Sequence, residues 1–201
     1  MSSARGTRLE VCGAAAVSGA AAGLAFVWRG DADAYDASWA WTRSLGWLTL
    51  VCLCAALLVT PLVQLRRWLA RRGAERPQAA PSASRLRRVL GVAAFGCGTL
   101  HAGNALWFVP DVAASLSSTA SLRVGLAAWV ILAALAITSL PAVLQRWRLK
   151  AWKELHRLAY VALPLALLHA AQASFVPLQP LLWLGAATLL FGLLRVLPAR
   201  R

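Results

Sequence analysis

Long apolar stretches separated by short basic segments constrain the fold of this sequence most. A helix that spans a bilayer needs roughly 20 apolar residues, and we expect such spans at residues 10–28, 44–64, 87–108, 122–143, 152–173 and 178–197. These stretches take up most of the 201 residues, of which 60% are hydrophobic and 14% charged. The sequence therefore predicts an all-α integral membrane protein, a six-helix bundle with no separate soluble domain.

The distribution of lysine and arginine predicts the orientation of these spans. The segment from Gln64 to Arg88 carries eight arginines against a single acid, Glu75. If both termini are inside, eighteen of the twenty-one Lys and Arg residues lie on the cytoplasmic side, as the positive-inside rule requires. We therefore expect an N-in, C-in, multi-pass protein with a membrane domain at 10–197 and cytoplasmic ends at 1–9 and 198–201. A secretory signal peptide is the alternative for the first span.

The net charge of +14 would suggest nucleic-acid binding in a soluble protein. Here the cations are concentrated in short segments between apolar stretches, where they would face anionic lipid. We therefore expect membrane lipid as a partner and no nucleic acid. The four cysteines all lie in apolar stretches without a CxxC motif, which favours buried packing residues over a metal site or a disulfide.

The three histidines, His101, His156 and His169, all lie inside apolar stretches, where a titratable group needs a partner. Given the predicted orientation, His101 and His169 each lie about 20 Å from the cytoplasmic end of their span. Two imidazoles at one depth on two helices can hold one haem iron between them. His156 lies near the inner face, either as a ligand of a second haem or as a group that lines the electron-entry site. Simple hydrogen bonding between helices and a proton or ion relay remain alternatives.

Arginines at the same depths are candidate contacts for haem propionates, which need cationic or hydrogen-bonding neighbours. On depth alone, Arg43 and Arg123 could serve an outer haem. Arg87, Arg88 and Arg157 could serve an inner one. An equally open interpretation is that these arginines anchor the helices to lipid headgroups.

Several short motifs, in this order and at these spacings, resemble the ferric-reductase-like transmembrane family over roughly residues 40–195. The third span carries Arg87-Arg88-Val89-Leu90-Gly91-Val92, then Phe95 and Thr99-Leu100-His101. Gly46 and Thr60-Pro61-Leu62 resemble the family's second helix, whereas Thr138-Ser139, Trp152-Lys153-Glu154-Leu155-His156, Tyr160 and His169 are similar to its fourth and fifth helices. The resemblance is strongest to the MsrQ (YedZ) subfamily, the haem-binding subunits of the periplasmic protein-methionine-sulfoxide reductase system.

This resemblance implies a haem b protein of the bacterial inner membrane, an electron-transfer subunit of an oxidoreductase complex rather than a complete enzyme. Its electrons would come from the quinone pool or a flavin carrier, with bound FMN as a further expectation. They would pass to a periplasmic molybdopterin-containing reductase that repairs oxidised methionines. The three histidines fall on the family's haem-associated positions.

Larger relatives in this superfamily carry four such histidines, whereas this chain has three. Arg87 and Ser115, fourteen residues to either side of His101, cannot supply the missing imidazole. The sequence therefore predicts one haem and leaves a second without a complete set of ligands. The alternatives are a stand-alone ferric or quinone reductase and a small transporter that uses the histidines as a relay.

Overall fold

The computed structural model describes residues 34–72, 83–107, 109, 111–146, 149–172 and 178–193, and all the regular structure in them is helical. The longer helices are α2 (Ala34–Arg72), α3 (Ala83–Trp107), α5 (Ala120–Thr138), α8 (Ala159–Ala171) and α9 (Leu178–Leu193). Shorter segments connect them: α4 (Val112–Ser118), α6 (Pro141–Leu144), α7 (Leu149–Leu155) and the 3-10 turn η1 (His156–Leu158). The predicted first span, 10–28, and both predicted cytoplasmic ends lie outside the described residues.

Helices long and apolar enough to cross a membrane are present at Trp39–Arg66, Ala83–Trp107 and Ala120–Thr138. They confirm the coarser prediction of an all-helical membrane protein. Helices α8 and α9, with 13 and 16 residues, are shorter than the roughly 20 residues that a complete span needs. The six-span topology and its N-in, C-in orientation therefore stay predictions.

The predicted spans 122–143 and 152–173 are each interrupted in the structure. Helix α5 ends at Thr138, and Leu140 is extended (φ −64°, ψ 135°) because a residue before a proline is disfavoured in the helical region. The other stretch is divided into α7, η1 and α8. The tighter η1 turn begins at His156, so this histidine is not part of the regular helix that follows it.

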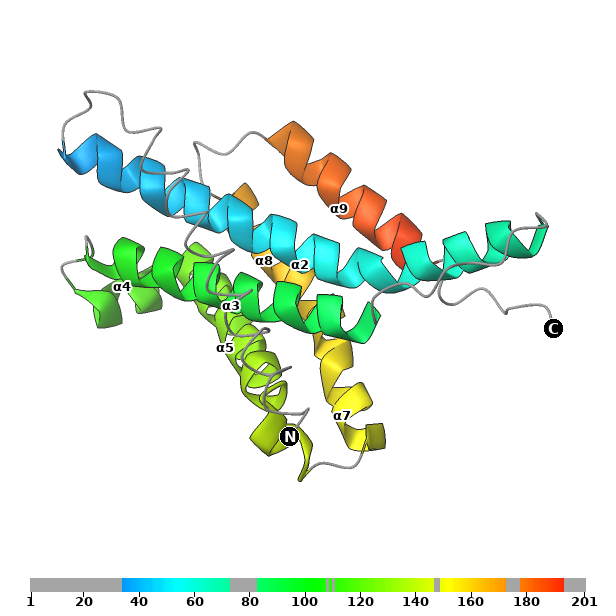
Figure 1. The fold of residues 1–201 in the computed structure, drawn as a ribbon. Coiled ribbons are helices and arrows are strands. Elements are labelled where there is room, and N and C mark those ends of the chain that lie inside the picture. Colours follow the sequence, from blue (N-terminus) through cyan, green and yellow to red (C-terminus); the bar gives the residue numbers. More distant parts are fainter. Residues whose placement is uncertain are drawn as a thin grey trace.

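The helices pair in two antiparallel hairpins. Helices α2 and α3 lie side by side, and α5 pairs with α8 (Figure 1). Helix α9 packs on α2, on the side away from α3. Contacts of α3 with α5 and of α2 with α8 join the two hairpins. The carboxyl ends of α3 and α8 thereby lie beside the amino-terminal parts of α2 and α5.

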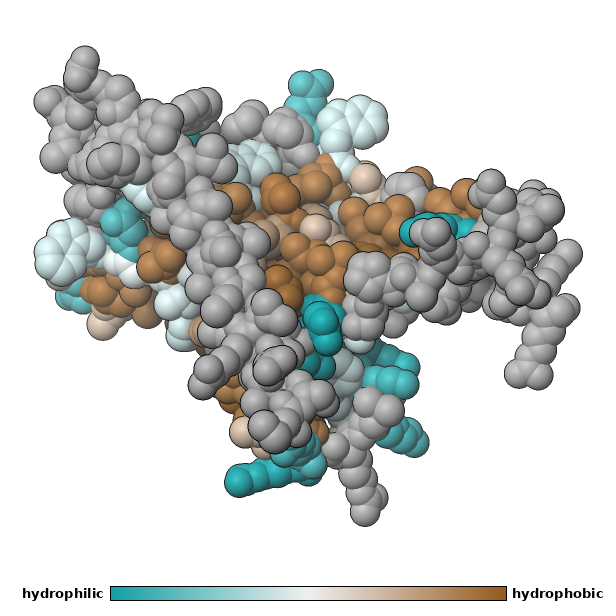
Figure 2. All heavy atoms as spheres, in the orientation of Figure 1, coloured by the Kyte–Doolittle hydropathy of each residue, from teal (hydrophilic) through white to brown (hydrophobic). Residues whose placement is uncertain are grey.

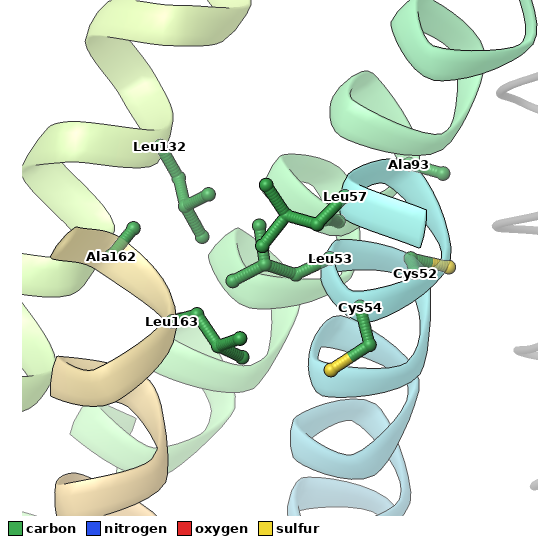
Figure 3. Close-up of a cluster of buried hydrophobic side chains, with 9 residues drawn as sticks. Cys52, Leu53, Cys54, Leu57, Ala93, Leu132, Ala162 and Leu163 are labelled. Carbon is green, nitrogen blue, oxygen red and sulfur yellow. The ribbon is translucent and has the colours of Figure 1, made fainter. Parts of the chain in front are cut away.

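The core lies where the two hairpins meet. Leu53 and Leu57 of α2, Leu132 of α5 and Leu163 of α8 point toward one another (Figure 3). Small residues such as Ala93, which is completely buried, let the helix backbones approach closely. Cys52, Cys54 and Cys97 are buried in this core, in agreement with their interpretation as packing residues.

The face of the protein that Figure 2 shows is apolar at its centre. In Figure 2 hydrophobic side chains cover the centre of the visible face, and hydrophilic ones gather at its lower end, where α5 and α7 lie. Large apolar side chains such as Val130 and Ile137 of α5 are more than half exposed. An apolar belt with polar ends is what a bilayer requires of the protein that it surrounds.

Candidate functional site

The structure brings His101 and His169 together between the two hairpins. His101 lies near the carboxyl end of α3 and His169 near that of α8. Their ring centroids are 5.9 Å apart, and the ring planes are inclined at 83° to each other. The two rings lie together, as residues at one level would, and both their depth in the membrane and their role as axial ligands stay predictions. We call this pair and its surroundings the histidine site.

Each ring is held by a backbone carbonyl of the helix that faces it. Nδ1 of His101 lies 2.7 Å from the carbonyl oxygen of Thr42 on α2, and Nδ1 of His169 lies 2.9 Å from that of Ser121 on α5. Because a carbonyl oxygen can only accept, Nδ1–H is the donor in both rings, and in a neutral imidazole this tautomer leaves the lone pair on Nε2. The part of the chain that the structure describes offers no hydrogen-bond partner to either Nε2.

Two glycines leave the space that the rings occupy. A Cβ atom added at Gly46 would lie 3.2 Å from Cε1 and Nδ1 of His101. At Gly125 it would lie 2.8 Å from Nδ1 and 2.9 Å from Cε1 of His169. Any larger residue at either position would therefore displace a histidine ring.

This arrangement fits the haem that the sequence predicts. Metal–imidazole nitrogen distances are about 2 Å, and a ring centre lies roughly 1 Å beyond its nitrogen, so two imidazoles on one iron have centroids about 6 Å apart. The observed 5.9 Å matches this spacing. Ligating histidines also donate their other ring N–H to a carbonyl or carboxylate, as both Nδ1 atoms do here. No group of three or more His, Cys, Asp or Glu side chains suited to a bare metal ion occurs among the described residues.

Two of the predicted propionate contacts lie at the same end of the bundle. Arg43 directly follows Thr42, and Arg123 lies two residues after Ser121, so both adjoin the carbonyls that hold the histidines. Both side chains are exposed, and Nη1 of Arg123 donates to the carbonyl of Ser117 at 3.5 Å. Their position suits a propionate, although an arginine at a headgroup level would lie there as well.

His156 lies in a separate environment at the other end of the α5–α8 hairpin. Its Nδ1 is 3.0 Å from the carbonyl oxygen of Trp152, and its Nε2 is 3.2 Å from Oγ of Ser139. The Trp152 and His156 rings stack with centroids 4.0 Å apart and planes inclined at 34°. Both ring nitrogens of His156 are thus engaged within the protein, unlike those of the histidine site.

Two of the predicted inner arginines lie near His156. Arg87 and Arg88, both half-buried near the start of α3, lie close enough to act electrostatically on its ring. The third predicted inner arginine, Arg157, is exposed and forms an ion pair with Glu154 at 2.6 Å. Arg87 and Arg88 therefore lie near His156, and Arg157 faces outward.

Reasoning from the sequence missed Thr42, Ser121 and Gly125 and singled out Gly46 only by its resemblance to the family's second helix. Thr42 and Gly46, and likewise Ser121 and Gly125, form two copies of a hydroxyl residue followed four positions later by glycine. Each copy lies near the amino-terminal end of a helix that faces a histidine. This repeated pattern of a hydroxyl residue and a glycine is visible in the sequence. It identifies the histidine site only once it is known which helices pair with each other.

Comparisons with known proteins agree with this architecture. The model of the family described as "Ferric reductase like transmembrane component" matches residues 45–167. The Protein-methionine-sulfoxide reductase heme-binding subunit MsrQ of Herminiimonas arsenicoxydans is 37% identical over 133 residues, which are 64% of this chain and 56% of that protein. MsrQ of Bordetella pertussis is 36% identical over 159 residues, 75% of this chain and 71% of the relative.

The chain thus spans little more than half the length of several curated relatives that it matches. The matched region begins on α2 just after Thr42 and ends on α8 just before His169, so it contains most of both helix hairpins, His101 included. The chain therefore belongs to the ferric reductase-like transmembrane family and, within it, to the MsrQ group.

Proposed function

We propose that this chain is a membrane electron-transfer subunit that binds haem b between His101 and His169. The observation that carries the proposal is the geometry of the pair, with ring centroids 5.9 Å apart. Both Nδ1 atoms are held by carbonyls, so both Nε2 atoms are left for a metal. The relatives named as heme-binding subunits support the same cofactor.

The residues of the chain contribute to this function in two places, at the histidine rings and in the core. The carbonyls of Thr42 and Ser121 fix the tautomer and the direction of each imidazole and raise its basicity. The buried apolar cluster of the two hairpins keeps water away and holds the helices at a constant separation. A bound haem b would supply one-electron chemistry, and two protein ligands on its iron favour electron transfer over oxygen binding.

The proposed route of electrons runs between the two ends of the bundle. We place the histidine site on the outer side, where a periplasmic molybdopterin-containing methionine-sulfoxide reductase would accept electrons. The names of the relatives support a methionine-sulfoxide reductase system as the partner. The donor would be the quinone pool or a flavin carrier at the inner side, with FMN as a candidate bound group, in the inner membrane of a bacterium.

His156 is proposed to line the electron-entry site and not to ligate an inner haem. Both of its ring nitrogens already have partners, Trp152 and Ser139. The adjacent Arg87 and Arg88 would attract an anionic donor group, such as a reduced quinone or a flavin phosphate. A haem-to-protein ratio near one supports this assignment, and a ratio near two would contradict it.

The test of the proposed function is the reduced-minus-oxidised absorption spectrum of the purified protein. The wild type should show a b-type signal, and His101→Ala and His169→Ala should each abolish it. Thr188→Val is a matched control, because Thr188 is a buried polar residue whose hydroxyl bonds its own helix at Leu184. A wild type without a b-type signal, or a signal that survives both histidine replacements, would refute the proposal.

The partner is tested separately. Co-purification of the chain with a molybdopterin-containing periplasmic protein, and reduction of that protein by the haem-loaded chain, would support the proposed complex. A haem-loaded chain that reduces ferric chelates and no such protein would favour a stand-alone reductase.

A further inference from the structure

We infer that two copies of one structural device position the haem ligands, and that Gly46 and Gly125 are its essential residues. This inference rests on the proposed function. In each copy, a helix presents a backbone carbonyl and, four residues later, a glycine to a histidine of its hairpin partner. Thr42 and Gly46 serve His101, and Ser121 and Gly125 serve His169.

The spacing of four has a direct physical meaning in an α-helix. The carbonyl of residue i already accepts the N–H of residue i+4, and its second lone pair can accept one more donor. A Cα–Cβ bond is tilted toward the amino end of its helix, so a side chain at i+4 covers the turn that contains that carbonyl. Glycine at i+4 leaves the carbonyl open, and the imidazole Nδ1–H reaches it at 2.7 and 2.9 Å.

The side-chain hydroxyl groups of Thr42 and Ser121 also bond to the helices that carry the histidines, α3 and α8. Oγ1 of Thr42 accepts a hydrogen bond of 2.5 Å from the amide of Asn104, which lies one turn beyond His101. Oγ of Ser121 lies 3.1 Å from Nδ1 of His169 and 3.4 Å from its backbone carbonyl. Asn104 is therefore an additional positioning residue in the first copy.

The two copies also have the same place in the fold. In each hairpin, the first helix carries the carbonyl and glycine near its amino end, and the second carries the histidine near its carboxyl end. The hairpins α2–α3 and α5–α8 therefore run in the same order and face each other across the histidine pair (Figure 1). A parallel internal repeat of this kind would give the iron two equivalent ligands.

Glycines often serve only to let helices pack closely, and the structure separates that role from the one inferred here. The atoms closest to the added Cβ are imidazole atoms at both Gly46 and Gly125. At Gly185 the closest atom, also at 2.8 Å, is a methyl group of Leu167. At Gly103, on the same helix as His101, nothing lies within 4 Å.

These differences define the experiment. Gly125→Ala and Gly46→Ala are compared with Gly185→Ala, which is equally crowded but meets a leucine, and with Gly103→Ala, which meets nothing. The readouts are haem per protein, the rate of haem loss to apomyoglobin, and the electron paramagnetic resonance spectrum of the oxidised protein. Circular dichroism and size-exclusion chromatography in detergent follow the fold.

Gly125→Ala should weaken haem retention by about tenfold or more, the usual effect of disturbing residues behind a metal ligand. Gly46→Ala should act in the same direction but less strongly, because its Cβ would lie at 3.2 Å and not 2.8 Å from the ring. Even with haem bound, both variants should shift the low-spin resonances. The two control variants should keep wild-type resonances and retention.

Two results would overturn the inference alone. One is a wild-type haem spectrum in which Gly46→Ala and Gly125→Ala change neither retention nor resonances. The other is an equal change in Gly185→Ala, which would assign the glycines to helix packing. If Gly125→Ala does not fold, the milder Gly46→Ala decides the question. A wild type that binds no haem overturns the proposed function as well, so the two failures are distinguishable.

Discussion

Truncation of Leu163 tests whether the core of the bundle controls the histidine site. Leu163 is 1% exposed, lies in the cluster of Figure 3, and precedes His169 by six residues on α8. In water, Leu→Ala in a core costs about 2.7–5 kcal/mol, which includes both transfer and cavity terms. The transfer term for three carbons is about 2.4 kcal/mol at 0.8 kcal/mol per methylene. It largely vanishes in a bilayer, because lipid tails are as apolar as leucine.

The cavity term then remains, so Leu163→Ala should lower the free energy of unfolding by about 0.5–2.5 kcal/mol. Denaturant titration in detergent micelles, followed by circular dichroism, measures it, and the haem absorption reports on the site. The matched control is Leu168→Ala, because Leu168 is 49% exposed although it adjoins His169. Equal destabilisation by the two substitutions would refute the reasoning, because a lipid-facing position leaves no cavity.

Three further predictions concern the site. The ring planes of His101 and His169 are inclined at 83°. The electron paramagnetic resonance spectrum of the oxidised haem protein should therefore show the strongly anisotropic low-spin signal of near-perpendicular imidazoles. The rhombic spectrum of parallel rings would contradict this geometry. His156→Gln should keep the b-type spectrum and slow haem reduction by a quinol in stopped-flow measurements, whereas loss of all haem would make His156 a ligand. Thr42→Val removes the hydroxyl that accepts from Asn104 and keeps the carbonyl, so it should destabilise the protein by about 0.5–1.5 kcal/mol without loss of haem. Thermal unfolding and haem content check this last effect, and complete haem loss would show that the hydroxyl is essential.

The level of the two histidines could be predicted because lipid forces spanning segments into helices of constant rise. Counting from the basic ends of the predicted spans placed His101 and His169 at one depth, and their rings lie together in the structure. The angular relation of His156 to His169 could not be predicted. On an ideal helix thirteen residues put them about 140° apart, but the η1 turn at His156–Leu158 interrupts that helix.

The partners of the histidines were beyond prediction for a different reason. Every residue carries a backbone carbonyl, so no residue type marks Thr42 or Ser121 as the acceptor of an imidazole N–H. Gly46 could be noticed from the sequence by its resemblance to a family position, but its purpose depends on the ring that faces it from α3. Such information lies in the pairing of helices and not in either helix alone.

The hairpin arrangement has a consequence for how the protein is assembled. Each histidine is hydrogen-bonded within its own hairpin, His101 to α2 and His169 to α5. A hairpin that has entered the membrane therefore already presents its ligand in the correct rotamer and tautomer. Only the separation of the two halves is left to adjust when they meet. The two imidazole rings are thus oriented before the hairpins associate. This reduces the conformational entropy that is lost when a cofactor binds between them.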